Sequence, residues 1–240
     1  MTEADGGPGR TFVLVHGAWH GGWCWARVRD ILTARGHRVF TPTLTGLADR
    51  SHLMSHDITL NTHILDVANL IEWERLKDVV LCGHSYAGWV VSGAAELAEA
   101  RIAFLVYLDA YIPEDGESWI KCTSAGGRAG MERALNSGGE LPPPDARNFR
   151  VNEADREWVN SLLTPHPVGV ALTPIRLTGA RDRIGRKAAI RAPAYSNVRF
   201  DADFAKAKAD PRWQTFEVPC GHDVMIDMPE ELADLLEQVA

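Results

Sequence analysis

The stretch Val79–Gly88 (V-V-L-C-G-H-S-Y-A-G) constrains the fold more than any other part of the chain. Four apolar residues lead into Gly83, and Ser85 follows two positions later among small residues. A strand that turns at once into a helix needs small residues there, and the residue at the apex is held in a strained conformation above the sheet. We interpret the stretch as a nucleophile elbow of the type G-x-S-x-G, with Ala87 replacing the last glycine. The alternative is an ordinary strand–helix turn that happens to contain a serine.

Apolar and alternating runs predict the strands, and helical spacing predicts the helices between them. Strands are expected at residues 11–15, 37–41, 79–82, 102–108, 187–192 and 213–218, and helices at 26–35, 60–75, 200–209 and 229–239, with another beginning near Trp89. This alternation predicts an α/β fold, a doubly wound and mostly parallel sheet of about six strands. We expect one domain, residues 1–240.

Residues 114–174 break this pattern. They are rich in Gly, Pro and Ser, with short helical stretches only around 129–135 and 154–163. A long segment without sheet periodicity inside an α/β pattern predicts a cap inserted over the site. The alternative is a flexible surface insertion.

Composition narrows the classes of partner. A net charge of −7 disfavours nucleic acid and anionic membranes as partners and leaves a small-molecule substrate. The four cysteines form no C-x-x-C pair and no zinc-like cluster, so we predict neither a metal nor another cofactor. Residues 1–10 lack the apolar core of a signal peptide and no run is long enough to span a membrane, so we expect a cytoplasmic enzyme.

Several polar features come directly after predicted strands: the loop beginning His16-Gly17, Ser85, Asp109 and the loop 219–223. Ligands of parallel sheets bind beyond the carboxyl ends of the strands. These features should therefore meet at one edge of the sheet, which favours a catalytic role for Ser85.

A serine hydroxyl needs a base to act as a nucleophile. Among the nine histidines we favour His222, because it lies on the loop after the last strand. His84 is expected to support the elbow and His16 the glycine-rich loop. Four other histidines, on loops or an exposed helix, receive no role: His20, His52, His56 and His63.

The acid that orients the histidine has three candidates. We favour Asp109, which ends the strand after the elbow helix. Asp182 lies in a segment, 177–182, that looks like a strand followed by G-x-x-D, but it is 40 residues before His222 (222 − 182) with another strand candidate between. Asp223 is the weakest candidate, because a residue adjacent to the histidine on a tight loop usually points elsewhere.

An oxyanion requires preorganised donors, and the backbone N–H groups of Ala18 and Tyr86 are the natural pair. We predict a mostly apolar pocket that includes Trp19, Trp119 and Trp158, with Trp23 as a further candidate. Each of these tryptophans has core or cap packing as its alternative role.

Three motifs resemble the α/β-hydrolase superfamily: H-G-A-W-H-G-G-W-C-W at residues 16–25, G-H-S-Y-A-G at 83–88 and G-H-D at 221–223. They are most similar to the branch of plant methyl esterases and hydroxynitrile lyases with their bacterial relatives. The resemblance implies the α/β-hydrolase fold, a Ser85–His222 pair and an oxyanion hole at Ala18 and Tyr86. The plant relatives carry their acid after the next-to-last strand, whereas cofactor-free ring-cleaving dioxygenases of the superfamily carry it where Asp109 stands.

The expected function is that of a serine hydrolase of small carboxylic esters, with amides and carbamates also possible for bacterial relatives of this kind. One alternative is lyase or cofactor-free oxygenase chemistry, and another is non-catalytic ligand binding. Hydroxynitrile lyases of the branch carry threonine where this chain has Gly17 and lysine where it has Asp223, which disfavours cyanohydrin cleavage.

Overall fold

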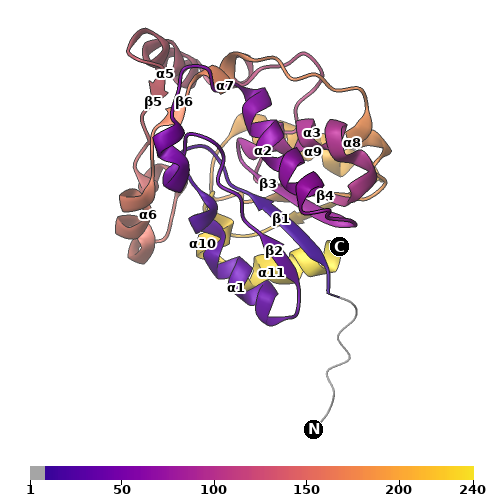
Figure 1. The fold of residues 1–240 in the computed structure, drawn as a ribbon. Helices are drawn as coiled ribbons and strands as arrows, with labels where there is room; N and C mark the ends of the chain where they lie inside the picture. The colour runs from indigo at the N-terminus through magenta and orange to yellow at the C-terminus, as the bar shows by residue number, and fades with distance from the viewer. Residues whose placement is uncertain (1–8) are drawn as a thin grey trace.

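A six-stranded parallel sheet crosses the centre of the computed structural model, which describes residues 9–240 (Figure 1). The strand order is β2-β1-β3-β4-β7-β8, and the predicted fold class is confirmed. The strands are β1 (Thr11–Val15), β2 (Arg38–Phe40), β3 (Val79–His84), β4 (Ile102–Leu108), β7 (Lys187–Arg191) and β8 (Trp213–Glu217). The sequence predicts that residues 1–10 are not a signal peptide. Residues 1–8 of this stretch lie outside the described residues.

Alternate side chains of each strand pack on opposite faces of this sheet, as the pleat requires. Val13 and Val15 of β1 belong to a core that includes α2 (Leu60–Trp73) and α3 (Ala87–Ala98). Phe12 and Leu14 of the same strand belong to a second core with α1 (Ala26–Ala34) and α11 (Pro229–Val239). The sheet is therefore covered on both faces, which explains why its central strands are apolar throughout.

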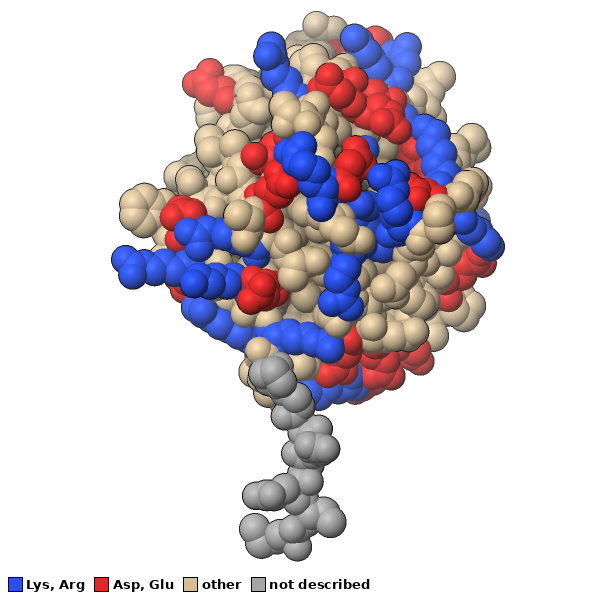
Figure 2. All heavy atoms as spheres, turned by 90° about the vertical axis from the view of Figure 1, so that its right-hand side faces the viewer, with Lys and Arg blue, Asp and Glu red and all other residues tan. Residues whose placement is uncertain are grey.

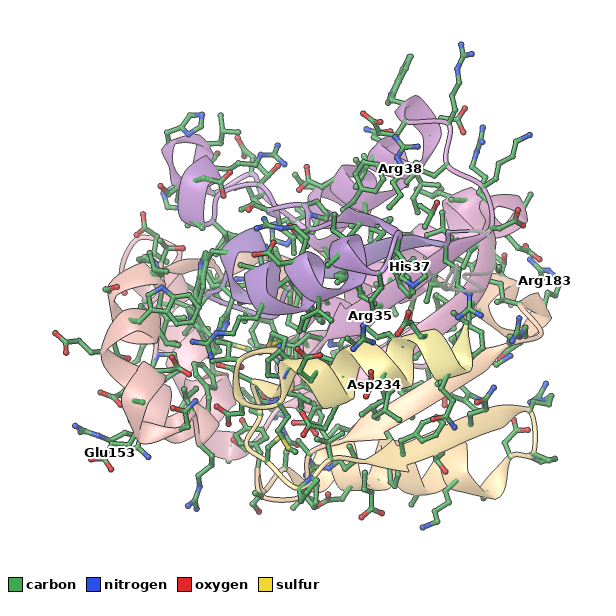
Figure 3. The ribbon with its side chains drawn as sticks, turned by 90° about the horizontal axis from the view of Figure 1, so that it is seen from below. Arg35, His37, Arg38, Glu153, Arg183 and Asp234 are labelled. Carbon is green, nitrogen blue, oxygen red and sulfur yellow. The ribbon has the colours of Figure 1, made fainter. Side chains whose placement is uncertain are left out.

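The last helix, α11, is fixed to α1 at the sheet's second face. Arg35 donates to Asp234 at 2.7 Å, and the His37 imidazole lies 2.6 Å from a Glu237 oxygen. Figure 3 shows Arg35, His37 and Asp234 close together where α1 and β2 meet α11. The Arg35–Asp234 pair is exposed and stabilises little, whereas the His37–Glu237 pair is partly buried. Apolar residues beneath both pairs pack α11 against the sheet.

One strand suggested by the sequence does not form. The segment 177–182 contains no strand, because Gly179 adopts φ +94° and turns the chain into the short helix α8 (Ala180–Arg183). Asp182 lies on this helix with its side chain 53% exposed. The next strand of the sheet is β7, followed by α9 (Val198–Ala209).

Residues 114–174 carry short elements of their own, which Figure 1 shows gathered beyond the ends to which the strands point. They are α4 (Trp119–Cys122), α5 (Ala125–Asn136), β5 (Glu140–Leu141), η4 (Ala146–Phe149), η5 (Glu153–Asp155), α6 (Arg156–Leu162), β6 (His166–Pro167) and α7 (Gly169–Leu172). β5 and β6 form a separate antiparallel pair. The remaining elements are η1 (Gly22–Trp25), η2 (Ala48–Leu53), η3 (Glu99–Arg101) and α10 (Val224–Asp227).

The surface carries basic and acidic side chains side by side. On the face drawn in Figure 2 the two signs are interspersed, so charge is balanced locally there. Exposed ion pairs of the chain include Arg183 with Glu99 at 2.7 Å and Arg38 with Glu74 at 2.9 Å. Across residues 9–240, no helix combines the length and the apolar character needed to cross a bilayer.

Candidate active site

Ser85 occupies the turn between β3 and α3 with φ +55°, a conformation that costs a non-glycine residue about 1–3 kcal/mol. The turn is held by two backbone hydrogen bonds, from Ser85 N to Leu108 O and from Gly88 N to Ser85 O, both 3.1 Å. A Cβ atom at Gly88 would collide with the carbonyl oxygen of Tyr111. The strict need for glycine is therefore at position 88, and Ala87 is accommodated within the elbow.

Ser85, His222 and Asp109 form one continuous chain of hydrogen bonds. The Ser85 hydroxyl lies 2.8 Å from His222 Nε2, and His222 Nδ1 lies 2.5 Å from Asp109 Oδ2. Because a carboxylate only accepts, the proton sits on Nδ1 and leaves Nε2 to accept from the hydroxyl. The three residues come from the ends of β3 and β4 and from the loop after β8, as the parallel topology requires.

The other two candidate acids lie elsewhere. Asp182 is exposed, 3.9 Å from the guanidinium of Arg181. Asp223 is buried with His20 Nε2 3.1 Å away. Burial alone would raise the pKa of Asp223, but the charge and hydrogen bond of His20 outweigh burial and bring this pKa down to about 2. Burial likewise lowers the pKa of His20, but Asp223 outweighs it and the net shift is upward. These two residues form a buried ion pair beside the site.

His16 and His84 hydrogen-bond to the backbone of loops around the site, in agreement with the supporting roles expected for them. Leu44 N donates to His16 Nε2 at 3.0 Å, so His16 Nδ1 carries the proton and donates to Gly17 O at 2.8 Å. Burial lowers the pKa of His16 to about 3 and keeps it neutral. His84 Nε2 donates to the carbonyl of His222 at 3.0 Å, and burial holds its pKa far below the usual range.

His63 is not on an exposed helix face, contrary to the sequence interpretation. It is buried on α2, with Nδ1 3.0 Å from the Tyr86 hydroxyl and Nε2 2.9 Å from Thr45 O. Burial lowers its pKa to about 4. The helical spacing could have revealed this, since His63 lies four residues before the buried Val67.

The backbone amides of Ala18 and Tyr86 are the two predicted oxyanion donors. Neither N–H donates to another backbone group within residues 9–240. Gly17 lies where the loop after β1 approaches the elbow. A Cβ atom on Gly17 would lie 2.9 Å from His84 Nδ1 and 3.0 Å from Ser85 Cβ. Glycine at this position thus allows the loop after β1 to approach the elbow.

Ser85 and His222 open into a cavity of about 680 Å³. Its aromatic lining comprises Trp19, Tyr111, Trp119, Phe149, Tyr195 and Phe200. The indole N–H of Trp19 donates to Leu141 O at 3.0 Å and that of Trp119 to the Tyr111 hydroxyl at 3.1 Å. Both indoles therefore have satisfied donors and present apolar ring surface to the cavity.

Trp158 does not line this cavity, and the prediction for it is corrected. Its ring packs edge-on against Trp23 at 5.3 Å and beneath the guanidinium of Arg27 at 5.3 Å. Trp23 is likewise absent from the lining. Residues 114–174 instead contribute Trp119 and Phe149 to the aromatic lining, and the Phe149 ring lies 5.8 Å from the His222 ring at an interplanar angle of 32°.

Three residues near the site received no role from the sequence: the partly buried Tyr195 and the buried His166 and Arg191. Tyr195, on the loop after β7, stacks on the His222 ring at 4.3 Å with an interplanar angle of 25°. His166 accepts from Trp19 N at 3.3 Å. Arg191, the last residue of β7, donates to Asp109 Oδ1. Its signal in the sequence was a charge that follows the apolar residues 188–190 of this strand.

Sequence and structure comparisons agree with this architecture. The profile of the alpha/beta hydrolase family matches residues 12–235. The carbendazim hydrolyzing esterase of Nocardioides sp. (strain SG-4G) is 42% identical over 237 residues, 94% of this chain and 97% of that protein. Salicylic acid-binding protein 2 of Nicotiana tabacum is 35% identical over 107 residues, 44% of this chain and 41% of that protein. An extracellular alpha/beta-hydrolase of a Paenibacillus species superposes with a TM-score of 0.82 at 21% identity, covering 96% of this chain and 99% of that one.

The chain belongs to the alpha/beta hydrolase family. Its similarity to a named esterase over nearly its whole length places it among the ester hydrolases of that family.

Proposed function

We propose that the protein is a serine hydrolase that cleaves small carboxylic or carbamic esters through an acyl-enzyme on Ser85. The observation that carries this proposal is the unbroken hydrogen-bond chain from Ser85 through His222 to Asp109, which ends at the aromatic cavity. A serine with a histidine in reach, itself oriented by a third group, is the arrangement that nucleophilic catalysis needs.

In the first half-reaction the Ser85 oxygen attacks the carbonyl carbon while His222 Nε2 takes the hydroxyl proton. His222 then returns this proton to the leaving alcohol as the carbon–oxygen bond breaks, which leaves the acyl group on Ser85. In the second half-reaction a water molecule attacks the acyl carbon, His222 takes its proton and delivers it to Ser85, and the acid is released. Asp109 holds the imidazole in the required tautomer and stabilises its protonated form.

The amides of Ala18 and Tyr86 are proposed to bind the oxygen that becomes negative in each half-reaction. Both are unengaged by other backbone groups and flank Ser85. Such preorganised donors are worth on the order of 10²–10³ in rate each.

The lining of the cavity favours a flat, aromatic substrate. Aromatic side chains stack with rings offset or edge-to-face, and six of them surround this cavity. Carbendazim, the compound in the name of the 42% identical relative, combines a flat heteroaromatic ring with a methyl carbamate and is therefore the first compound to test. For a carbamate the released carbamic acid loses carbon dioxide to give the amine.

The proposal is tested by reacting the purified protein with a fluorophosphonate probe, followed by a screen of esters, amides and carbamates of graded size. We expect stoichiometric labelling at Ser85 and turnover of at least one aromatic ester or carbamate. Absence of both labelling and turnover would favour a non-catalytic binding protein. Oxygen uptake with heteroaromatic substrates, or aldehyde release from cyanohydrins, without hydrolysis would replace the proposal with the oxygenase or lyase alternative.

The two cap tryptophans should differ in their effect on catalysis. Trp119→Ala removes ring surface from the cavity, so we expect KM for an aromatic ester to rise about 10-fold, equivalent to roughly 1–2 kcal/mol of lost contact. Trp158→Ala removes a similar ring outside the cavity and should leave KM within about twofold. Steady-state kinetics on both variants checks this, and an equal rise in KM for both would contradict the assigned lining.

A further inference from the structure

Arg191 is a buried arginine whose guanidinium contacts both the acid Asp109 and the loop that carries Tyr195. It is 4% exposed at the end of β7, and its guanidinium donates four hydrogen bonds. Nη1 donates to Asp109 Oδ1 and to Ala192 O, the latter at 2.6 Å. Nη2 donates to Tyr195 O at 2.5 Å, while Nη2 and Nε lie 2.8 and 2.9 Å from Asp201 Oδ1. A guanidinium held by four hydrogen bonds cannot rotate without breaking several of them at once.

This guanidinium donates to the Asp109 oxygen that is not hydrogen-bonded to His222. Asp109 Oδ2 faces His222, whereas Oδ1 accepts from Arg191 and from Ala192 N at 3.0 Å. The carboxylate is fully buried and its residue has φ +42°. With both oxygens engaged, its plane is set relative to the imidazole.

Arg191 also fixes the ring that covers His222. It holds the carbonyl of Tyr195, whose ring stacks on the imidazole at 4.3 Å. Phe200, which lies 6.0 Å below the guanidinium, stacks on the same imidazole at 5.7 Å. One side chain thus orients both the acid and the stacking surface of the histidine.

The charge environment of His222 is defined by few groups. On its own loop, Asp223 is paired with His20 at 3.1 Å, and burial raises the pKa of the Cys220 thiol to about 12. From β3, the neutral His84 ring lies 4.4 Å away. From the loop after β7, the Tyr195 phenol is neutral because burial raises its pKa. Asp109, Arg191 and Asp201 form an anion–cation–anion row beside His222. Arg199, which lines the same cavity from α9, is paired with Glu117 and Asp203, both at 2.8 Å.

We propose that Arg191 is a positioning residue for the proposed triad, which fixes Asp109 and tempers the negative charge that Asp109 presents to His222. The inference rests on the proposed roles of Ser85, His222 and Asp109. The guanidinium is opposite in charge to the Asp109 carboxylate, so it offsets part of the negative potential that Asp109 creates at the imidazole. Asp201 works in the other direction, because it neutralises part of the Arg191 charge from the solvent side.

Replacing Arg191 tests the positioning role. In Arg191→Met we expect kcat for an aromatic ester to fall about 10- to 100-fold with little change in KM, because the acid and the stacking ring are less well placed. The acid limb of the pH profile of kcat/KM, which reports the free enzyme's base, should move to higher pH by about one unit. Arg191→Lys keeps the positive charge but loses the planar set of guanidinium donors. We therefore expect kcat to fall while the acid limb moves less than in Arg191→Met.

Asp201→Asn is expected to displace the acid limb in the opposite direction to Arg191→Met. The variant should fold normally, since the Asp201 carboxylate is 60% exposed. Removing this anion leaves the Arg191 charge less neutralised, so the acid limb should move to lower pH, by roughly 0.3 unit. The matched control is Asp210→Asn, a partly exposed carboxylate that pairs with Arg212 and does not line the cavity, and its profile should coincide with that of the unaltered protein.

Opposite displacements in Arg191→Met and Asp201→Asn support the proposal. Displacements in the same direction overturn it, as does an unchanged profile in Asp201→Asn. If Arg191→Met does not fold, the pH profile of Asp201→Asn and the kcat of Arg191→Lys test the proposal without it. Failure of the proposed function is distinguishable, because Ser85→Ala would then retain turnover, whereas failure of this inference alone leaves Ser85→Ala inactive.

Discussion

Replacing Ser85 by alanine should lower kcat for an activated aryl ester by about 10⁴-fold or more, because the other groups of such a site supply only a residual acceleration once the nucleophile is gone. The variant should fold normally. The substitution removes one hydroxyl whose only side-chain partner is His222, and alanine fits the same small turn. Turnover is measured with a p-nitrophenyl ester and folding by thermal denaturation.

The matched control is Ser92→Ala. Ser92 is a buried serine on α3 that bonds Gly88 O at 2.7 Å and lies 2.8 Å from the Tyr107 hydroxyl, outside the cavity. We expect this variant to lose some stability, about 1 kcal/mol, yet to keep kcat within a few-fold. Undiminished turnover by Ser85→Ala, together with probe labelling of that variant, would overturn the proposed mechanism.

The sequence predicted the architecture well because the relevant physics is local. Apolar runs marked the buried strands, and the order of strands brought Ser85, Asp109 and the His222 loop to one edge, where the structure places them 2.5–2.8 Å apart along the chain of hydrogen bonds. The choice of Asp109 over Asp182 used position alone, and the structure joins Asp109, not Asp182, to the histidine. Gly179 explains why the strand suggested for the segment 177–182 does not form, since its positive φ turns the chain within that segment.

The remaining features depend on tertiary packing that no local pattern contains. Trp158 and Trp119 both lie in the predicted cap, and only the path of the chain decides that one faces the cavity and the other faces Trp23. Arg191 is a second such case, because no local pattern in the sequence joins it to Asp109. At the end of β7 the structure places a cation that binds an acid from the neighbouring strand.

Comparing Asp109→Asn with Asp182→Asn should give the second largest difference in rate. In Asp109→Asn the amide can present an N–H to His222 Nδ1, which favours the tautomer with its proton on Nε2 and so removes the acceptor for the Ser85 hydroxyl. A triad altered in this way loses on the order of 10⁴ in kcat. Asp182→Asn changes an exposed carboxylate that makes no hydrogen bond to the site and should stay within about twofold.

Asp223→Asn completes this comparison, because Asp223 is buried next to His222 yet bonds a different histidine. Removing its charge leaves His20 without its ion-pair partner, so the expected cost is in stability, about 3–5 kcal/mol if His20 stays charged and less if it loses its proton. Thermal denaturation therefore separates the two buried acids: Asp109→Asn should be mainly a kinetic defect and Asp223→Asn mainly a stability defect. A large loss of kcat in Asp182→Asn alone, or in a fully folded Asp223→Asn but not in Asp109→Asn, would move the acid to that residue and remove the basis for the role of Arg191.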